Sequence, residues 1–399
     1  MKTIKRKMKI LFVLYNNFEC NSAIHVHNFA NAMVELGHEC IVAVPDKKES
    51  VRELSGNGSL YSPAEYEDII KGKVAFKNNV KPDIIHIWTP REIPRMFFLQ
   101  LKKKYNKSRY IVHLEDNEEI ILSKQINMKR EQLKKLSAKE LTAIIPETCA
   151  HPVFYKQFLR DADGVTVIID TLLSFVPKEM FSMVLWPIID TERFAPREKN
   201  MELMRRLGMD GRHLIVCYTG NVHLANAHEV RSLYLAVALA NREGLPVKLI
   251  RTGKDHCDFL GEQTKWAYKN SIELGRVNFE EIPQLLALAD ILIQPGKPDI
   301  FNDYRLPSKI PEFLSMGKPV VVPNTNIGRY LTDKENALIT EKGDGLELLS
   351  IITNIAKNGH LRDKLSKGSR EFALKNFNKK SISMKLERFY RKLLTKGSH

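Results

Sequence analysis

The feature that most constrains the fold of this sequence is an alternation between short, continuous β-prone runs and longer segments of helical periodicity. Residues 10–14 (ILFVL) form the first run, apolar side chains at helical spacing follow between Val26 and Leu36, and residues 40–44 (CIVAV) form the next run. Continuously apolar strands are typical of sheets that are covered on both faces. Because crossovers between parallel strands are right-handed, the pattern predicts a β-α-β unit within a parallel sheet.

The same alternation continues along the chain in two blocks, separated near residues 186–196. Further strands are predicted at residues 83–88, 110–114, 164–169, 213–219, 246–250, 290–294 and 320–323. Further helices are predicted at about residues 229–242, 283–288 and 312–316. A single core stops growing at about 250–300 residues, so a chain of 399 residues is expected to form two domains. We therefore predict an α/β protein with two Rossmann-like domains, residues 1–187 and 188–376.

Composition limits the possible settings and partners. The formal net charge is +15, which favours anionic partners, although a solvated lysine-rich surface explains it equally well. The five cysteines are scattered without metal-like spacing, which indicates free thiols in a reducing compartment and no metal site. No apolar run approaches the ~20 residues of a membrane span, so we expect a cytoplasmic protein. Residues 397–399 are typical of an expression-tag remnant.

Five segments, in this order, resemble the motifs of the retaining GT-B glycosyltransferases, the group that includes bacterial glycogen synthases and lipid mannosyltransferases. The segments are HNFANAMVELGH (27–38), PDIIH (82–86), IIDTERFAP (188–196), ALADILIQP (287–295) and EFLSMGKPVVV (312–322). The resemblance implies a GT-B fold, in which two Rossmann-like domains face a central cleft. It also implies that residues 1–187 bind the acceptor, that residues 188–376 bind a nucleotide sugar, and that a helix within residues 377–396 crosses back to the N-terminal domain.

The donor site is expected in the loops that follow the C-terminal strands, because ligands bind at the carboxyl ends of strands in open α/β sheets. Glu312 matches the second Glu of the family's E-x7-E motif, which implies that it binds the ribose hydroxyls; the alternative is a surface salt bridge. The first Glu of that motif, which in the family contacts the donor sugar, is replaced by Tyr304, and the adjacent Asp303 could serve instead with a one-residue shift. Asp303 and Tyr304 are therefore both donor-binding candidates. Arg305, Ser308 and Lys309 resemble a subgroup with "PSK" in this loop, and we predict that they approach the donor diphosphate.

The two cations that the family places after the first C-terminal strand are absent. The corresponding residues are Asn221, which follows Gly220, and Asn226. Replacements are available on loops at the same edge of the sheet. The candidates are Arg251 and Lys254, which flank Gly253, together with Arg305 and Lys309.

The acceptor site is expected after the strand at residues 110–114. Where the family carries a strand ending in TxHD, Glu115 occupies the position of the His and Asp116 that of the Asp. His113 stands two residues earlier, and strand alternation predicts that it points to the same side. We therefore name Glu115, His113 and Asp116 as catalytic candidates, with Lys309 stabilising the departing diphosphate. The alternative is a solvated acidic turn.

The resulting prediction is a retaining glycosyltransferase that uses a nucleotide sugar, with UDP favoured, and a glycan or lipid-linked acceptor in envelope polysaccharide or glycoconjugate synthesis. The resemblance implies no metal and no cofactor. One alternative is a nucleotide-sugar 2-epimerase, which shares the architecture. Another is a non-enzymatic basic binding protein with a degenerate site, which the missing cations favour. Nucleic acid is not an expected partner, because aromatic residues do not alternate with the basic ones in a stacking platform.

A basic stretch at residues 122–148 suggests peripheral contact with an anionic membrane, at the inner face of the cell membrane. Lysines and arginine stand there among apolar residues, and attraction of these cations to anionic lipid would suit a lipid-linked acceptor. The apolar residues are Leu122, Ile126, Leu133, Leu136 and Leu141. A solvated, mobile segment is the alternative.

Overall fold

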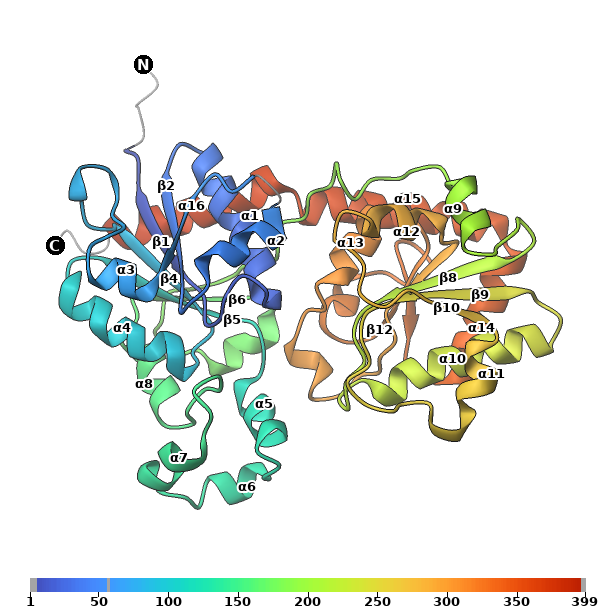
Figure 1. Cartoon of the computed structure of the whole chain (residues 1–399), viewed down its shortest axis with the longest axis horizontal. Helices are drawn as coiled ribbons and strands as arrows, with labels where there is room; N and C mark the ends of the chain where they lie inside the picture. The colour runs from blue at the N-terminus through green and yellow to red at the C-terminus, as the bar shows by residue number, and fades with distance from the viewer. Residues whose placement is uncertain (1–5, 56–57, 396–399) are drawn as a thin grey trace. The chain divides into compact units, whose positions relative to one another are not determined.

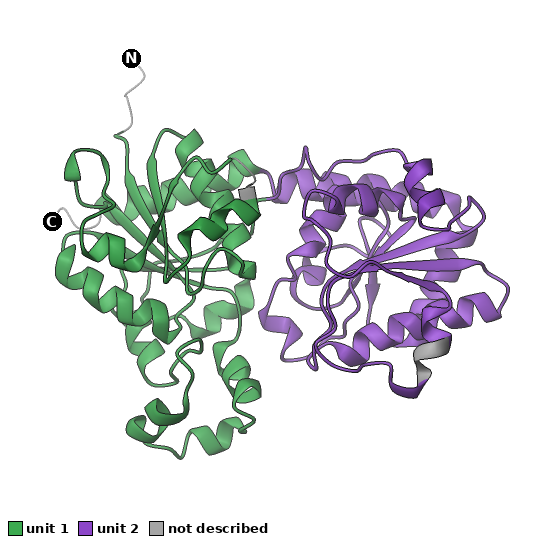
Figure 2. Ribbon diagram, viewed as in Figure 1, with its two compact units in different colours: residues 1–188, 379–399 green, residues 189–378 purple. Residues whose placement is uncertain are grey.

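The computed structural model describes residues 6–55 and 58–395, so the expected tag remnant at 397–399 lies outside the described residues. The chain divides into two compact units (Figure 2). Unit 1 comprises residues 1–188 and 379–399, and unit 2 comprises residues 189–378. Each unit contains one parallel sheet of Rossmann-like type, as the alternation of strands and helices predicted.

Unit 1 has a seven-stranded parallel sheet with helices on both faces (Figure 1). In spatial order the strands are β3 (Ser62–Glu65), β2 (Glu39–Val44), β1 (Lys9–Val13), β4 (Ile84–Trp88), β5 (Arg109–Leu114), β6 (Gly164–Val167) and β7 (Ser182–Val184). The helices packed around it are α1 (Asn21–Glu35), α2 (Val51–Ser55), α3 (Tyr66–Ile70), α4 (Glu92–Lys104), α8 (Phe154–Arg160) and α16 (Lys379–Thr395). The side chains of β4 are buried along its whole length, as expected for a central strand covered on both faces.

The last helix, α16, packs on unit 1 although the chain reaches it through unit 2. Its Tyr390 is fully buried, and the hydroxyl lies 2.7 Å from Nδ1 of His86 on β4. Leu386 and Phe389 join the apolar core that β1 and α1 line. Gly164 makes this packing possible, since a Cβ atom there would lie 3.1 Å from the Phe389 ring.

Between β5 and α8 the chain leaves the sheet and forms three short helices, which extend away from it in Figure 1. They are α5 (Glu118–Gln125), α6 (Arg130–Leu133) and α7 (Ala138–Ile144). Leu122, Leu133 and Leu141 are buried in a small core of their own, against which Ile126 and Leu136 pack. These side chains therefore hold the three helices together, and contact of this stretch with a membrane stays a prediction.

Unit 2 has a six-stranded parallel sheet. In spatial order the strands are β10 (Ser271–Glu273), β9 (Val247–Thr252), β8 (Leu214–Thr219), β11 (Ile291–Ile293), β12 (Val320–Pro323) and β13 (Leu338–Thr340). Its helices are α9 (Met201–Arg206), α10 (Ala227–Arg242), α11 (Thr264–Tyr268), α12 (Ile282–Leu288), α13 (Lys309–Ser315), α14 (Gly345–Lys357) and α15 (Gly359–Asn376). Pro311 lies in the first turn of α13, where a missing N–H costs no hydrogen bond.

The four strands that sequence periodicity missed are the edge strands of the two sheets: β3, β7, β10 and β13. Each has only three or four residues. An edge strand pairs on one side only and is partly solvated, so it does not need the continuous apolar run that marks a central strand. Within the part of the chain that is described, no helix combines the length and apolarity needed to cross a bilayer.

Candidate functional site

The carboxyl edge of the unit 2 sheet is built around two glycines in very close contact. Gly220 follows β8 with φ +155°, and Gly253 follows β9 with φ +107°. A Cβ atom at residue 253 would lie 2.4 Å from both the carbonyl carbon and the carbonyl oxygen of Gly220. Only glycine allows this approach, since a left-handed φ and a backbone clash would both oppose a side chain. The two loops are thereby held together, and their backbone is exposed to a third segment, the start of α13.

Lys309, the first residue of α13, reaches across to Gly220. A Cβ atom at residue 220 would lie 2.5 Å from the Lys309 ammonium, which itself lies 5.0 Å from the centre of the Tyr218 ring. No carboxylate pairs with this ammonium among the described residues. Burial lowers the pKa of Lys309 to about 8, helped by the nearby Arg305 and opposed by Glu312. An ammonium that is half-buried without a counter-ion is available to an anionic ligand.

Glu312 lies one turn further along α13 and is also half-buried. Its carboxylate has neither a hydrogen bond nor an ion pair with any described residue. Burial raises the pKa of Glu312 to about 7, although Lys309 and Arg193 act in the opposite direction. The alternative prediction of a surface salt bridge is therefore wrong for Glu312, because no described cation lies within ion-pair distance.

Two further residues of the predicted phosphate loop complete this edge. Arg305 stacks its guanidinium 4.7 Å from the centre of the Phe301 ring, and its buried Nε has no hydrogen-bond partner among the described residues. Ser308 is the exposed N-cap of α13. Arg305, Lys309 and Glu312 are thus three charged groups on one short segment, and none of them forms an ion pair with another described residue.

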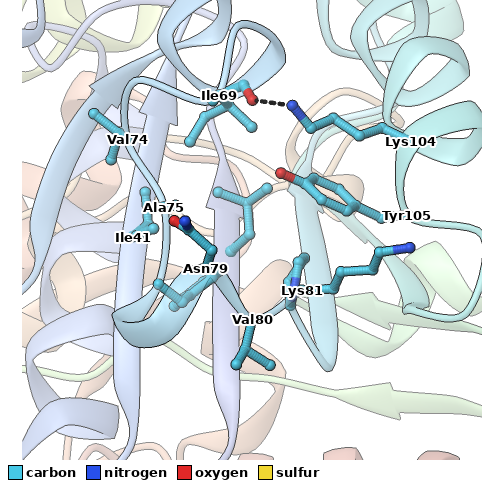
Figure 3. Close-up of a pocket in the computed structure, with 13 residues that line it drawn as sticks. Ile41, Ile69, Val74, Ala75, Asn79, Val80, Lys81, Lys104 and Tyr105 are labelled. Carbon is cyan, nitrogen blue, oxygen red and sulfur yellow. Dashed lines mark hydrogen bonds between the residues drawn. The ribbon is translucent and has the colours of Figure 1, made fainter.

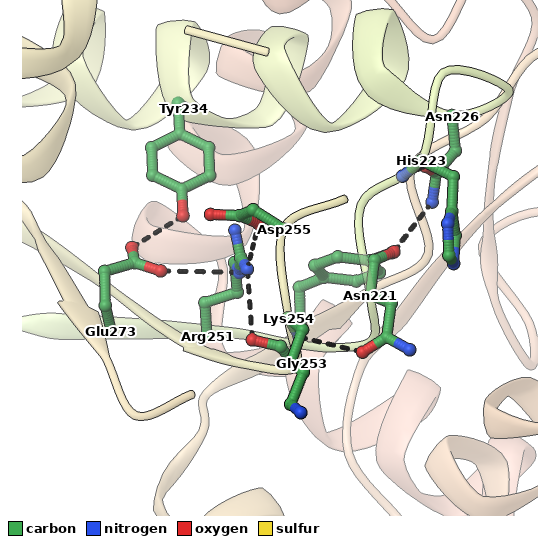
Figure 4. Close-up of polar contacts among 10 residues, drawn as sticks. Asn221, His223, Asn226, Tyr234, Arg251, Gly253, Lys254, Asp255 and Glu273 are labelled. Atoms are coloured by element: carbon green, nitrogen blue, oxygen red, sulfur yellow. Dashed lines mark hydrogen bonds and ion pairs between the residues drawn. The ribbon is translucent and has the colours of Figure 1, made fainter. Parts of the chain in front are cut away.

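Arg251 differs from these residues because its charge is already balanced (Figure 4). It is 2% exposed, and its Nη2 donates to Asp255 at 2.5 Å and to the carbonyl of Gly253 at 3.2 Å. Its Nε lies 3.3 Å from Glu273, which also accepts a 2.6 Å hydrogen bond from the Tyr234 hydroxyl. Asp255 and Glu273 therefore balance the charge of Arg251, which holds the loop after β9, while its buried Nε and Nη1 have no hydrogen-bond partner among the described residues.

The amide side chains that stand where the family carries cations are used to shape the same loops. Asn221 accepts a hydrogen bond from the backbone N–H of Lys254 at 2.8 Å. Asn226 donates to the carbonyl of Asn221 at 3.1 Å. The Lys254 side chain is exposed and points away from Arg251 in Figure 4. Of the four predicted replacement cations, Arg305 and Lys309 are therefore the two that are unpaired and partly enclosed.

Sequence reasoning missed the contribution of the loop after β12. Thr325 is buried and donates a short hydrogen bond to Asp303. Asn326, with φ +44°, donates to the carbonyl of Asn302 at 3.1 Å. These contacts hold the 3-10 turn Asn302–Tyr304, which carries both candidates for the missing first Glu. The Asn-Thr-Asn sequence at 324–326 was the available signal, because Asn tolerates left-handed turns.

In unit 1, Glu115 is the centre of a buried polar cluster at the carboxyl ends of β4 and β5. Its carboxylate accepts hydrogen bonds from Trp88 Nε1 at 2.7 Å and from Ser22, and lies 3.0 Å from Nδ1 of His25. Burial would raise the pKa of Glu115, but His25, His113 and Ser22 together lower it to about 2. Ser22 and His25, in the first turn of α1, were missed because the sequence does not show which loop faces Glu115.

His113 lies beneath this cluster rather than at the surface. It is 1% exposed, stacks on the Trp88 ring at 4.0 Å, and has Nδ1 2.8 Å from the Thr166 hydroxyl. Burial lowers its pKa to about 3, so the ring is neutral. His113 interacts electrostatically with Glu115, but its burial keeps it from a substrate, and we assign it a supporting position.

The rest of the acidic stretch is divided between the surface and internal ion pairs. Asp116 is half-buried, whereas Glu118 is buried and paired with Arg91 at 3.0 Å. Glu119 accepts a hydrogen bond from the Tyr155 hydroxyl at 2.8 Å. A fully solvated acidic turn is therefore ruled out. Within the described ranges, no group of three His, Cys, Asp or Glu side chains is arranged to hold a metal ion.

Two comparisons with known sequences each match part of the chain. Residues 213–358 match the sequence model of the family described as Glycosyl transferases group 1. The uncharacterized glycosyltransferase MJ1178 of Methanocaldococcus jannaschii is 26% identical over 121 residues, which is 30% of this chain. The matched region amounts to 33% of that relative, so this chain spans about a third of its length.

Comparison with solved structures concerns the whole chain. The Anabaena protein Alr3699/HepE in complex with UDP gives a TM-score of 0.71 at 15% identity, covering 96% of this chain and 100% of that one. A glycosyltransferase from Rickettsia africae ESF-5 gives 0.70 at 15% identity, covering 98% and 99%. Sucrose-phosphate synthase from Thermosynechococcus elongatus gives 0.66 at 13% identity, covering 98% and 100%. At these identities the likeness shows the fold, which is the GT-B fold.

Proposed function

This chain has the GT-B fold and carries a group 1 glycosyltransferase domain in unit 2, and on this premise we propose that it transfers a sugar from a nucleotide-diphosphate donor. The observation that carries the proposal is the unpaired Lys309 and Glu312, one turn apart at the carboxyl edge of the unit 2 sheet. Leaving opposite charges half-buried and unpaired costs stability, and such groups cluster at functional sites.

In this proposal each group binds a different part of the donor. Glu312 accepts hydrogen bonds from the ribose hydroxyls, while Lys309 and Arg305 bind the diphosphate. Backbone N–H groups of the Gly220–Asn221 loop and of the start of α13 contribute further donors, as at other phosphate sites. UDP is the favoured nucleotide, supported by the Anabaena protein's structures with UDP and with UDP-glucose.

The proposed reaction retains the anomeric configuration. The acceptor hydroxyl forms the new glycosidic bond while the bond between the sugar and the diphosphate breaks. The departing diphosphate takes the electron pair of that bond, and its oxygen accepts the hydroxyl proton. Lys309 and Arg305 stabilise the charge that develops on this leaving group. Unit 1 contributes the acceptor side, where the Glu115 carboxylate is held ionised and orients His25.

The acceptor in the proposal is a glycan or a lipid-linked glycan of envelope polysaccharide or glycoconjugate synthesis. Contact with an anionic membrane through residues 122–148 would be electrostatic, since Leu122, Leu133 and Leu141 are buried in the small core of that stretch. Co-sedimentation with anionic vesicles that disappears at high salt would support this contact. Charge-reversal of Lys134 and Lys135 should abolish it.

The donor assignment is tested by measuring the affinities of UDP, GDP, ADP and CMP for the wild type and for Glu312→Ala. One nucleotide should bind to the wild type and lose affinity by at least about tenfold in the variant, since a hydrogen bond to a charged group contributes about 1.5–3 kcal/mol. Glu371→Ala, an exposed site on α15, is the matched control. Absence of binding by all four nucleotides would favour the non-enzymatic alternative.

The reaction is tested by nuclear magnetic resonance of the product formed from the bound nucleotide sugar. An α-linked donor should give an α-linked product on an added glycan acceptor. Inversion would refute the proposed mechanism while leaving the donor site intact. Conversion of the donor sugar to its 2-epimer without any acceptor would instead identify the epimerase alternative.

A further inference from the structure

Unit 1 contains a cavity of about 340 Å³ that the proposed transfer does not use (Figure 3). It lies over the β1 and β2 side of the sheet, beneath the segment that joins α3 to β4. Lys81 and Pro82 lie shortly before β4, separated from it by Asp83, and Tyr105 follows α4 before β5 begins. The cavity therefore lies toward the amino ends of these strands, whereas Glu115 lies at their carboxyl ends.

The interior of the cavity is apolar. Leu11 of β1, Ile41 of β2 and Ile69 of α3 are buried side chains of its floor. Val74 and Val80, from the α3–β4 segment, supply walls, and Val80 is 46% exposed at the opening. No carboxylate lines the cavity. Sugars and ribose are bound by groups that accept hydrogen bonds from hydroxyls, so this lining does not suit them.

The polar side chains of the cavity are cationic or neutral: three lie along one wall, and the Asn79 amide lies on the opposite side (Figure 3). Figure 3 shows Lys104, Tyr105 and Lys81 along that wall, with the Tyr105 hydroxyl directed into the open space. Lys104 donates to the carbonyls of Ile69 at 2.9 Å and Ile70 at 2.6 Å, so its position is fixed while its charge is not neutralised. Neither the Tyr105 hydroxyl nor the Lys81 ammonium has a hydrogen-bond partner among the described residues.

The two segments that line the cavity are rich in lysine, although only Lys81 and Lys104 belong to the lining itself. Residues 71–82 contain four lysines and no carboxylate, and residues 102–108 contain another four lysines and no carboxylate. Of these eight side chains in the described structure, Lys71 and Lys73 alone have a carboxylate within 4.0 Å, from Glu67 and Asp68 respectively. Lys102 donates to the carbonyl of Asp161 instead, and the Glu39 carboxylate accepts from the N–H of Lys77. Two lysines in an apolar lining that contains no carboxylate favour a molecule with an anionic group and an apolar body.

We propose that this cavity binds an anionic amphiphile, a molecule whose alkyl chain enters the apolar interior and whose phosphate or carboxylate head meets Lys81, Lys104 and the Tyr105 hydroxyl. A nucleic acid fits less well, because the opening offers no platform of exposed aromatic side chains. The inference does not depend on the donor site in unit 2.

The test is isothermal titration calorimetry of the full chain with alkyl phosphates below their micelle concentrations. Affinity should rise about fourfold for each methylene between hexyl and decyl phosphate, as expected for a chain entering an apolar site. Decyl maltoside, which has the same chain and no charge, should bind at least tenfold more weakly. Equal binding of the two decyl compounds would overturn the proposal.

Two variants locate the site. Ala75→Trp, at an exposed residue of the cavity wall, should abolish binding of decyl phosphate, and Lys81→Glu should weaken it at least tenfold. Ala143→Trp and Lys139→Glu, exposed sites on α7, are the matched controls and should bind like the wild type. Unchanged melting temperature and unchanged UDP-glucose affinity in all four variants exclude misfolding as the cause. Undiminished binding by Ala75→Trp would refute the assignment.

Vesicles distinguish the two sources of such a ligand. Binding to phosphatidylglycerol vesicles, but not to phosphatidylcholine vesicles, that is lost in Ala75→Trp would assign the site to a lipid of the bilayer. Binding of decyl phosphate without binding to either vesicle would assign it to a soluble amphiphile. Vesicle binding that survives in Ala75→Trp and fails in Lys81→Glu would show a surface charge effect and would overturn the cavity site.

Discussion

Glu312→Gln should make the ligand-free protein more stable at pH 8 while removing its affinity for the nucleotide. The reason is that the wild-type carboxylate is half-buried and has no ion-pair or hydrogen-bond partner among the described residues. Burial raises the pKa of Glu312 from an ordinary 4.5 to about 7. A carboxyl whose pKa is raised by folding destabilises the folded state wherever the unfolded chain would ionise it.

The magnitude follows from these two pKa values. Relative to a neutral side chain, the linkage relation gives a cost of about 3 kcal/mol at pH 8 and about 1 kcal/mol at pH 5. Between pH 5 and pH 8, the free energy of unfolding of the wild type should therefore fall by about 2.5 kcal/mol relative to that of Glu312→Gln. A domain of about 190 residues, the size of unit 2, shifts its melting temperature by about 2–4 °C per kcal/mol. The expected separation between the two melting curves thus grows by about 5–10 °C over this pH range.

The assay is thermal denaturation of wild type and Glu312→Gln at pH 5, 6, 7 and 8, with Glu371→Gln as the control at an exposed site. Only Glu312→Gln should diverge from the wild type as the pH rises. Addition of UDP at 100 times its dissociation constant should raise wild-type stability by about 2.7 kcal/mol and should leave the variant unchanged. Parallel melting curves for wild type and Glu312→Gln across the whole range would refute the reasoning, since the carboxylate would then carry no burial cost.

Three further outcomes are expected. Gly253→Ala should lower the stability of unit 2, measured by urea denaturation, by at least about 2 kcal/mol and abolish nucleotide binding, because the added Cβ would lie 2.4 Å from Gly220. Gly244→Ala is the control: it has open space around it and should lower the stability by about 1 kcal/mol. The affinity for UDP-glucose, measured by calorimetry, should be greatest between pH 7 and 8 and should fall above pH 8 as Lys309 loses its proton. If the charge of this residue binds the donor, Lys309→Arg should remove the fall, since arginine stays protonated. Because the pKa of Glu115 in the folded protein is about 2, its ionised carboxylate stabilises the fold above about pH 4.5, and this stabilisation is lost as the pH falls toward 2. His25→Phe removes a partner of the carboxylate and should raise the pH midpoint of acid unfolding. An unchanged midpoint would show that the imidazole does not hold this carboxylate.

Local sequence determined the central strands and the class of fold. Runs such as residues 10–14 and 40–44 are apolar on both faces, and only a strand covered on both sides buries them. The alternation of these runs with amphipathic helices then requires parallel strands and two Rossmann-like units. The position of Glu312 in a helix after a strand-end loop was also readable, because it depends on short-range pattern alone.

Tertiary structure decided which charges are free. Arg251 and Lys309 are equivalent as cations in the sequence, but Asp255 and Glu273 neutralise the first, while the second faces glycine backbone and a tyrosine ring. Those neighbours come from other strands and loops, so no local pattern encodes them. His113 shows the same limit, since alternation gives its direction but only packing against Trp88 and Thr166 places it beneath the surface. Sequence thus determines what a side chain can do, and the surrounding fold determines whether its charge remains available.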